Sequence, residues 1–154
     1  KNKVDQIASS QAVGFVYASN FSLGVNLFFA FNEKLASMMN EYKDYQPRIH
    51  EIHHTGKKDE PSGTAITAAE GILKAYPALD GWTMDSESKG LTISAERMDP
   101  YFGTHIVSYD SSIDTIELKH EAHSRDGFAL GAVIAAEWLP GKKGPHNMKD
   151  VLGL

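Results

Sequence analysis

Three successive strand-like segments constrain the fold of this chain more than any other feature of its sequence. They cover about Leu91–Met98, Thr104–Tyr109 and Thr115–Ala122, and each is rich in β-branched or aromatic residues. The run "DSSID" between the last two is typical of a tight turn, so we expect those two strands to pair as an antiparallel hairpin. Helical patterns stand before and after the three segments. The sequence therefore predicts an α+β domain, a mixed sheet with helices packed on one face.

Three helices are predicted around these strands. The first begins at Leu23 after the capping run "SNFS" and continues for about five turns. The second follows Ser62 or Thr64 as its cap and ends near Tyr76, before a proline. The third runs from Asp126 to Pro140. The apolar stripe of the first helix consists of Leu27, Phe31, Leu35, Met38 and Tyr42, widened by Val25, Phe28 and Phe29.

The remaining segments are assigned from shorter signals. Val13–Ala18 is a continuous apolar run and predicts a buried strand. Pro47–His54 predicts another strand, with Ile49 and Ile52 buried. Residues 77–90 suit an irregular connection, and the last residues, "KKGPHNMKDVLGL", suit a loose tail.

Composition limits the classes of function. Hydrophobic residues make up 42% of the 154 residues and charged residues 23%, which is ordinary for a globular domain. A net charge of −5 without a basic tract disfavours nucleic acid as a partner. No apolar run has the length of a membrane span, so we expect no membrane partner. The lack of cysteine suits a reducing compartment, and we expect a cytoplasmic protein.

One stretch concentrates groups that carry chemistry: "EIHHTGKKDEPSGTA", residues 51–65. Its Ser-Gly-Thr run stands at a predicted helix start, where unpaired N–H groups and the helix dipole favour an anion. His53 and His54 carry protons that exchange near neutral pH. Lys57 can bind a second anionic group or stabilise developing negative charge. The stretch predicts a small, multiply anionic ligand.

Each part of this stretch also has a plainer interpretation. A Ser-Gly-Thr cap is mostly structural, and paired histidines are more often solvated than catalytic. A metal site through His53, His54 and either Glu51 or Asp59 is another alternative. However, "HHTGK" lacks the one-turn spacing of helical zinc motifs, and the lysines would repel a cation.

The whole string is more specific than its parts. It resembles the signature E-x-x-H-H-x-x-K-x-D-x-P-S-G-T-A, offset by one at its start, of the 4-hydroxy-tetrahydrodipicolinate reductase (dihydrodipicolinate reductase) family. "YASNFSLGVNLF" is similar to the family's segment between its nucleotide and substrate domains. "GTHIVSYDSSIDTIELKHEAHSRDGFALGAV" is similar to its last strands and final helix, and "GPHNMKDVLGL" to its C-terminus. The resemblance runs from about residue 12 to residue 154.

The resemblance implies an activity: reduction of a cyclic imine dicarboxylate by NADPH or NADH in lysine and diaminopimelate biosynthesis. It implies that His53 is the general acid and Lys57 the assisting cation. The same resemblance implies that the substrate is bound by His54, Ser62, Gly63 and Thr64. The cofactor-binding residues it implies are Ala18, Ser19, Asn20, Phe21 and Arg125. Glu60 stands where family members commonly have alanine, and its charge would weaken binding unless it points to solvent.

The sequence lacks the glycine-rich turn with which the family's nucleotide domain binds the cofactor. We therefore expect residues 1–20 to be a remnant and hinge strand from a nucleotide domain, and residues 21–154 to form the substrate-binding and oligomerisation domain. The resemblance implies a homotetramer, and a chain without the nucleotide domain is expected to be inactive alone. A carboxylate-binding module without catalysis and a histidine-based metal hydrolase remain alternative functions.

Overall fold

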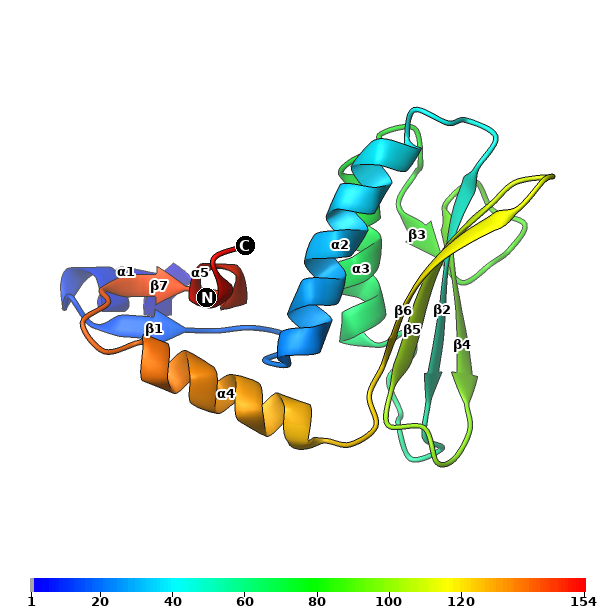
Figure 1. Ribbon diagram of the computed structural model, residues 1–154. Helices are drawn as coiled ribbons and strands as arrows, with labels where there is room; N and C mark the ends of the chain where they lie inside the picture. The colour runs from blue at the N-terminus through cyan, green and yellow to red at the C-terminus, as the bar shows by residue number, and fades with distance from the viewer. Residues whose placement is uncertain (1) are drawn as a thin grey trace. The chain divides into compact units, whose positions relative to one another are not determined.

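The computed structural model describes residues 2–154, which form two compact units (Figure 1). The larger unit is Leu27–Ser124. The smaller unit joins the segment up to Asn26 with Arg125–Leu154. The domain boundary predicted after residue 20 stays a prediction, and the units differ from it in two respects. The units divide between Asn26 and Leu27, and they group the C-terminal segment with the N-terminal one.

A five-stranded mixed sheet forms the larger unit, and the predicted fold class is confirmed. The strand order is β3-β4-β2-β5-β6, with β3, β4 and β2 parallel and the other neighbours antiparallel. The predicted hairpin between β5 and β6 is present across "DSSID". The strands span β2 Gln46–His53, β3 Trp82–Thr83, β4 Leu91–Arg97, β5 Thr104–Asp110 and β6 Thr115–Glu121. The two-residue β3 lies inside the segment expected to be irregular.

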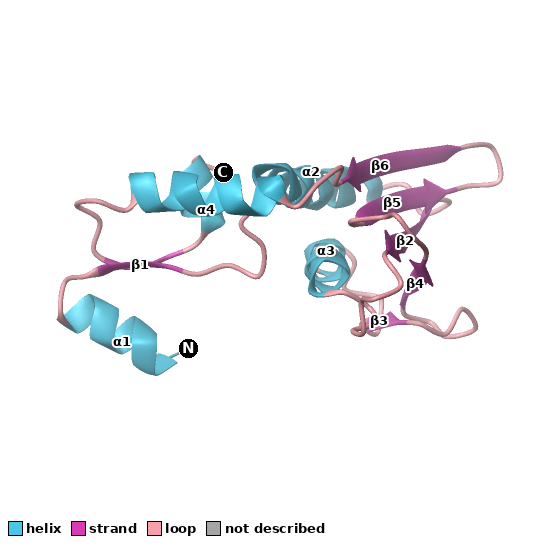
Figure 2. Ribbon diagram, turned by 90° about the horizontal axis from the view of Figure 1, so that it is seen from below, coloured by secondary structure: helices cyan, strands magenta, loops and turns pink. Residues whose placement is uncertain are grey.

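Two helices cover one face of this sheet. Figures 1 and 2 show α2 (Leu23–Met39) and α3 (Gly63–Leu73) on the same side of the strands. The Asn32 side chain, which is fully buried, donates to the carbonyl of Ala68 at 2.8 Å and so ties α2 to α3. The ring of Phe28 lies against the imidazoles of two β-strand histidines, with centroids 6.4 Å and 6.1 Å away. The core of the unit therefore lies between these helices and the sheet.

The apolar stripe predicted for α2 does not face this core. Phe31 and Met38 are 60% and 59% exposed, and the helix ends at Met39, before Tyr42. The buried face contains Val25, Phe28 and Phe29, which the sequence analysis treated as a widening of the stripe. It also contains Asn32, Ala36 and Met39, which the sequence analysis did not name. When both faces of a helix are apolar, the sequence pattern alone does not show which face is buried. Packing against the sheet decides it.

The strand β2 alternates more cleanly than its sequence indicates. Pro47, Ile49, Glu51 and His53 are buried, and the residues between them are exposed or half-buried. The expected burial of Ile49 is confirmed, but Ile52 is only half-buried because it points to the opposite face. A carboxylate and an imidazole thus take two of the four core-facing positions.

The smaller unit corrects two further predictions. Its elements are α1 Asn2–Ser10, β1 Gly14–Val16, α4 Asp126–Trp138, β7 Gly144–His146 and α5 Met148–Leu152. The buried strand predicted at Val13–Ala18 is instead the short β1, with Phe15 39% exposed, because β7 is its single partner in a two-stranded sheet. The tail predicted to be loose forms β7 and α5. Asn147 and Asp150 cap α5 with a reciprocal capping box.

Within the described residues 2–154, no helix combines the length and the apolar character that crossing a membrane requires.

Candidate functional site

The end of β2 presents acid and base groups to the face of the sheet that α3 contacts. Glu51 has no exposed surface and His53 is 7% exposed. His54, the first residue after the strand, is half-buried, and its carbonyl accepts the N–H of Lys57 at 3.1 Å. Of the two adjacent histidines, His53 is therefore the one that joins the buried carboxylate.

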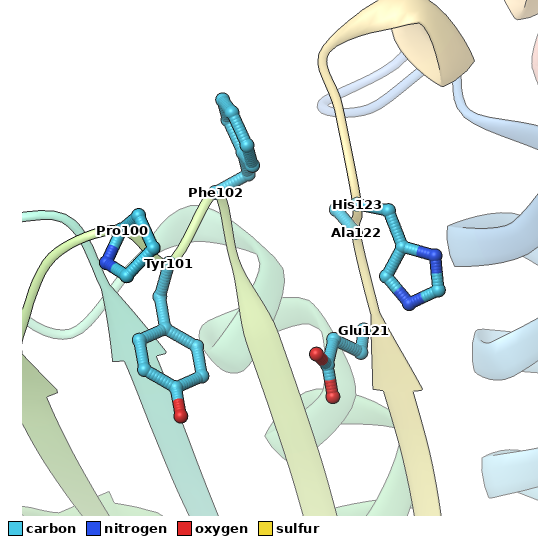
Figure 3. Close-up of a pocket in the computed structure, with 6 residues that line it drawn as sticks. All are labelled: Pro100, Tyr101, Phe102, Glu121, Ala122 and His123. Atoms are coloured by element: carbon cyan, nitrogen blue, oxygen red, sulfur yellow. The ribbon is translucent and has the colours of Figure 1, made fainter.

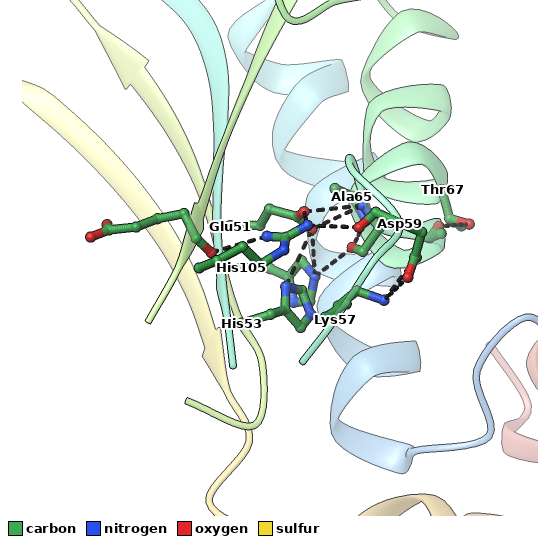
Figure 4. A network of polar contacts seen from close by, with 11 residues as sticks. Glu51, His53, Lys57, Asp59, Ala65, Thr67 and His105 are labelled. Atoms are coloured by element: carbon green, nitrogen blue, oxygen red, sulfur yellow. Dashed lines mark hydrogen bonds and ion pairs between the residues drawn. The ribbon is translucent and has the colours of Figure 1, made fainter. Parts of the chain in front are cut away.

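Glu51 is surrounded by donors (Figure 4). The N–H of Ser62 donates to its two carboxylate oxygens at 3.0 and 3.2 Å, and Nη2 of Arg97 donates to Oε1 at 3.1 Å. Nδ1 of His53 and Nε2 of His105 each lie 3.6 Å from Oε2. A buried carboxylate with so many partners is a fixed negative charge that organises its neighbours.

Sheet register brings these residues together. In the antiparallel pair β2–β5, Glu51 stands directly opposite His105. In the parallel pair β2–β4, His53 stands opposite Arg97. Because side chains of paired residues share a face, the two strands beside β2 supply one base and one cation to the same cluster.

The electrostatics follow from burial and from these partners. Burial alone would raise the pKa of Glu51, but the nearby His105 ring and the hydrogen bonds from Ser62 outweigh it and lower that pKa to about 2. Burial lowers the pKa of His53 to about 4, with a further contribution from nearby His105, and Glu51 offsets only part of the effect. At neutral pH the cluster therefore holds an ionised carboxylate beside a neutral imidazole.

The start of α3 is capped by Ser62, as the sequence predicts, and its role as an anion site stays a prediction. Ser62 is the N-cap: its Oγ accepts the N–H of Ala65 at 3.1 Å and also lies 3.1 Å from Nε2 of His105. Gly63 is exposed, and a Cβ built on it would meet nothing within 4 Å. Thr64, in the same first turn, is half-buried. The first turn of α3 is thus open at its glycine and anchored at its serine.

The loop between β2 and α3 carries the predicted cation. Nζ of Lys57 lies 2.8 and 2.7 Å from the carboxylate oxygens of Asp59. The carbonyl of Asp59 in turn accepts Nη2 of Arg97 at 2.7 Å, which links the loop to Glu51. Lys57 lowers the pKa of the Asp59 carboxyl. The structure thus brings His53, Lys57 and Ser62 into one cluster. Glu60 is exposed to solvent.

Sequence reasoning missed two members of the cluster and one partner. Arg97 and His105 lie in strands more than 40 residues from Glu51, and nothing local marks either of them. The alternation in "GTHIV" places His105 on the same face as Val107, which is a weak signal for burial. Asp59 was weighed only as a metal ligand, and its pairing with Lys57 was not anticipated.

The metal alternative meets a specific obstacle. One ligand atom each from Glu51, His53 and His105 lies within 4.8 Å of the others, a set different from the one predicted. The guanidinium of Arg97 already contacts Oε1 of Glu51, and the Ser62 N–H contacts both oxygens. Because a fixed cation and a backbone donor occupy this carboxylate, the arrangement favours a neutral histidine over a metal ion.

The residues implied for cofactor binding lie in the smaller unit. Ala18 and Phe21 pack against the apolar cluster of Ala135 and two α5 residues. Gly131 of α4 approaches the carbonyl of Phe21 so closely that a Cβ there would lie 1.8 Å from it. The Asn20 side chain accepts the N–H of Ser22 at 2.9 Å, while Ser19 and Arg125 are exposed. The structure therefore fixes the backbone of residues 18–21 against α4.

A separate pocket of about 370 Å³ lies at the β4–β5 connection and the end of β6. Figure 3 shows its lining: Pro100, Tyr101, Phe102, Glu121, Ala122 and His123. The carboxylate of Glu121 is paired with Lys119. No residue of the predicted site set lines this pocket.

The fold is an α+β domain with a capped helix start beside a buried acid–base cluster, and comparison with known proteins gives its family. The family model described as "Dihydrodipicolinate reductase, C-terminus" matches residues 24–152. The chain belongs to this family and corresponds to its C-terminal domain.

Two relatives are both named 4-hydroxy-tetrahydrodipicolinate reductase. The one from Christiangramia forsetii is 53% identical over 151 residues, which is 97% of this chain and 63% of the relative. The one from Methanosarcina barkeri is 40% identical over 157 residues, which is 98% of this chain and 58% of the relative. The chain thus spans about three-fifths of the length of these relatives.

A solved structure shows the same fold. It is titled dipicolinate-bound dihydrodipicolinate reductase, from Paenisporosarcina sp. TG-14, and matches with a TM-score of 0.75 and 22% identity. The match covers 95% of this chain and 57% of that one.

Proposed function

We propose that this chain is the substrate-binding domain of a 4-hydroxy-tetrahydrodipicolinate reductase and binds a cyclic dicarboxylate. The observation that carries the proposal is the open first turn of α3, capped by Ser62, beside the Lys57 ammonium. N–H groups at a helix start and a nearby cation suit two carboxylates on one small ligand. Family membership, and relatives that carry the reductase name, support the same assignment.

In this proposal the residues divide the work. Ser62, Gly63 and Thr64 take one carboxylate, with His54 at the edge of the site. Lys57 exchanges its partner Asp59 for the ligand. Such an exchange costs little, because an exposed ion pair contributes at most about 1 kcal/mol. His53 then supplies the proton at the carbon next to the reduced bond.

Because the pKa of His53 is lowered, proton donation by His53 requires that the ring first gain a proton. A neutral imidazole is not a general acid, so His53 must gain a proton when the substrate binds. A dianion beside the ring favours the protonated form, since opposite charges raise the pKa of a histidine. Binding of dicarboxylate is therefore accompanied by proton uptake. Calorimetry in buffers of different ionisation enthalpy at about pH 6 measures this uptake directly.

A nicotinamide dinucleotide supplies the hydride in the proposed reaction. In this chain, the carbonyl of Phe21 packs closely against Gly131 of α4, and Arg125 stands exposed just before α4. A fixed backbone edge and an exposed guanidinium fit a partly apolar, anionic cofactor. In this proposal, the preference for NADH or NADPH depends on the part of the relatives that this chain does not span.

The central test is calorimetric titration of the chain with pyridine-2,6-dicarboxylate (dipicolinate). We expect measurable binding, weakened roughly 10- to 100-fold in Lys57→Ala, as for loss of a hydrogen bond to a charged group. Lys58→Ala, an exposed neighbour in the same loop, is the matched control and should bind like the wild type. Failure of the wild-type chain to bind would contradict the proposal. Binding without proton uptake would favour a carboxylate-binding module without catalysis.

We also propose a homotetramer assembled through the sheet face that α2 and α3 leave uncovered, and a cytoplasmic location suited to amino-acid biosynthesis. Two half-buried isoleucines, Ile52 and Ile106, lie on that face. Light scattering tests the assembly, with a mass four times that of the chain expected and a monomer as the contradicting result.

A further inference from the structure

Nδ1 of His53 lies in an unusual position. It is completely buried and makes no hydrogen bond to any other described residue. The nearest opposite charge is Oε2 of Glu51, 3.6 Å away. A ring nitrogen that turned its lone pair toward an ionised carboxylate would be repelled, whereas an N–H there is attracted. The geometry therefore selects the tautomer of His53 with its proton on Nδ1.

The other edge of the same ring faces a glycine. A Cβ built on Gly103 would lie 3.2 Å from Nε2 and 3.3 Å from Cδ2 of His53. Gly103 places only backbone against this edge, and its φ of +156° is one that residues with side chains rarely adopt. With the proton on Nδ1, Nε2 carries the lone pair on the glycine side and is the nitrogen that can gain or lose a proton.

The carboxylate itself is held from two further sides. Arg97 donates to Oε1 of Glu51 and also to the carbonyl of Asp59, so it fixes both the acid and the loop that carries Lys57. The N–H of Ser62 donates to the same carboxylate at the start of α3. One buried charge thus sets the position of the imidazole, the loop and the helix start together.

We propose that Glu51, anchored by Arg97, is a positioning residue that holds His53 in the Nδ1–H tautomer, so that Nε2 is the nitrogen that exchanges a proton with the ligand. The assignment of a proton-transfer role to Nε2 rests on the proposed function above. The tautomer itself does not. The 3.6 Å separation is longer than a hydrogen bond, and contacts of this kind commonly tighten when a ligand closes the site.

Long-range ¹H–¹⁵N correlation spectra of the ¹⁵N-labelled chain report the tautomer directly. His53 signals are identified by their loss in His53→Gln. We expect Nδ1–H in the wild type, and a shift of the Nδ1–H to Nε2–H ratio by roughly tenfold or more in Glu51→Gln, as for loss of a charged hydrogen-bond partner. Glu96→Gln is the matched control: Glu96 is an exposed carboxylate 3.7 Å from His50 on the opposite face. It should leave the His53 signals unchanged.

Two further variants separate positioning from stability. Glu51→Asp keeps the charge and should retain Nδ1–H. Arg97→Lys should also retain it while weakening dipicolinate binding through the loosened loop. A wild-type His53 protonated on Nε2, or a tautomer ratio unchanged in folded Glu51→Gln, overturns the proposal. If Glu51→Gln does not fold, the wild-type spectrum still decides the tautomer and Glu51→Asp tests the carboxylate. If the tautomer is as expected but dipicolinate does not bind, the proposed function fails and the positioning role stands.

Discussion

The two sides of the candidate site differ in how they hold charge. On the strand side, Glu51 and His53 are buried, and their partners are fixed by sheet register. On the loop side, Lys57 and Asp59 form an ion pair in which the Asp59 side chain is 62% exposed and the Lys57 side chain 21% exposed. Buried charges interact strongly and are costly to disturb, whereas exposed pairs are screened and easily exchanged. The strand side is therefore suited to orienting groups, and the loop side to exchanging partners with a ligand.

The largest expected effect comes from removing the buried charge. Glu51→Ala leaves Arg97 and the Ser62 N–H without their acceptor, which should lower the free energy of unfolding by about 3–5 kcal/mol. Urea denaturation measures the change. Glu96→Ala is the exposed control and should stay within about 0.5 kcal/mol of the wild type. Equal effects of the two substitutions would remove the distinction between buried and exposed carboxylates.

The second-largest expected effect is a loss of stability at acidic pH, caused by protonation of the same buried cluster. The pKa of His53 is lowered from 6.5 to about 4 and that of Glu51 from 4.5 to about 2 in the folded state. In both cases the unfolded chain binds more protons than the folded one, so stability is highest above about pH 6.5 and falls as the pH drops toward 2. Each of these pKa differences corresponds to about 3 kcal/mol. Urea denaturation across this range should show the fall, and His53→Gln should flatten its upper part between pH 6.5 and 4. A wild-type curve that is flat between pH 6.5 and 4 would contradict the pKa assigned to His53.

A smaller effect is expected from crowding the free edge of His53. Gly103→Ala places a methyl group 3.2 Å from Nε2 and should cost about 1–3 kcal/mol of stability as overpacking. Gly81→Ala is the control for backbone conformation alone, because Gly81 also has positive φ but meets nothing within 4 Å. Thermal denaturation compares the two. A cost no greater at Gly103 than at Gly81 would mean that the ring has room to move.

The smallest effect should come from the loop. Asp59→Asn removes the partner of Lys57 and should change the free energy of unfolding by less than about 1 kcal/mol, with the difference reduced at high salt. The same variant should not weaken dipicolinate binding, because it leaves the ammonium available. A loss of stability comparable to that of Glu51→Ala would show that the loop pair is structural and would end the contrast between the two sides.

Local patterns were sufficient where the deciding contacts are local. The Ser62 cap, the "DSSID" hairpin and the helix that begins at Asp126 all depend on neighbours within a few residues, and all three predictions are confirmed. Predictions that needed distant partners were the ones that went wrong. The burial predicted for Val13–Ala18 depends on how many strands flank that segment. The C-terminal tail is ordered by pairing with β1, which lies 130 residues earlier in the chain.

For the site, the sequence by itself indicated that a histidine, a cation and a helix start gather after β2, and it weighed Glu51 only as a metal ligand. It also determined the family, because the spacing within residues 51–65 resembles one signature. Only the tertiary structure decided which histidine is buried, and which residues neutralise Glu51. The reason is physical. His105 and Arg97 reach Glu51 through strand register, and register is fixed by the packing of the whole sheet rather than by any local run of residues.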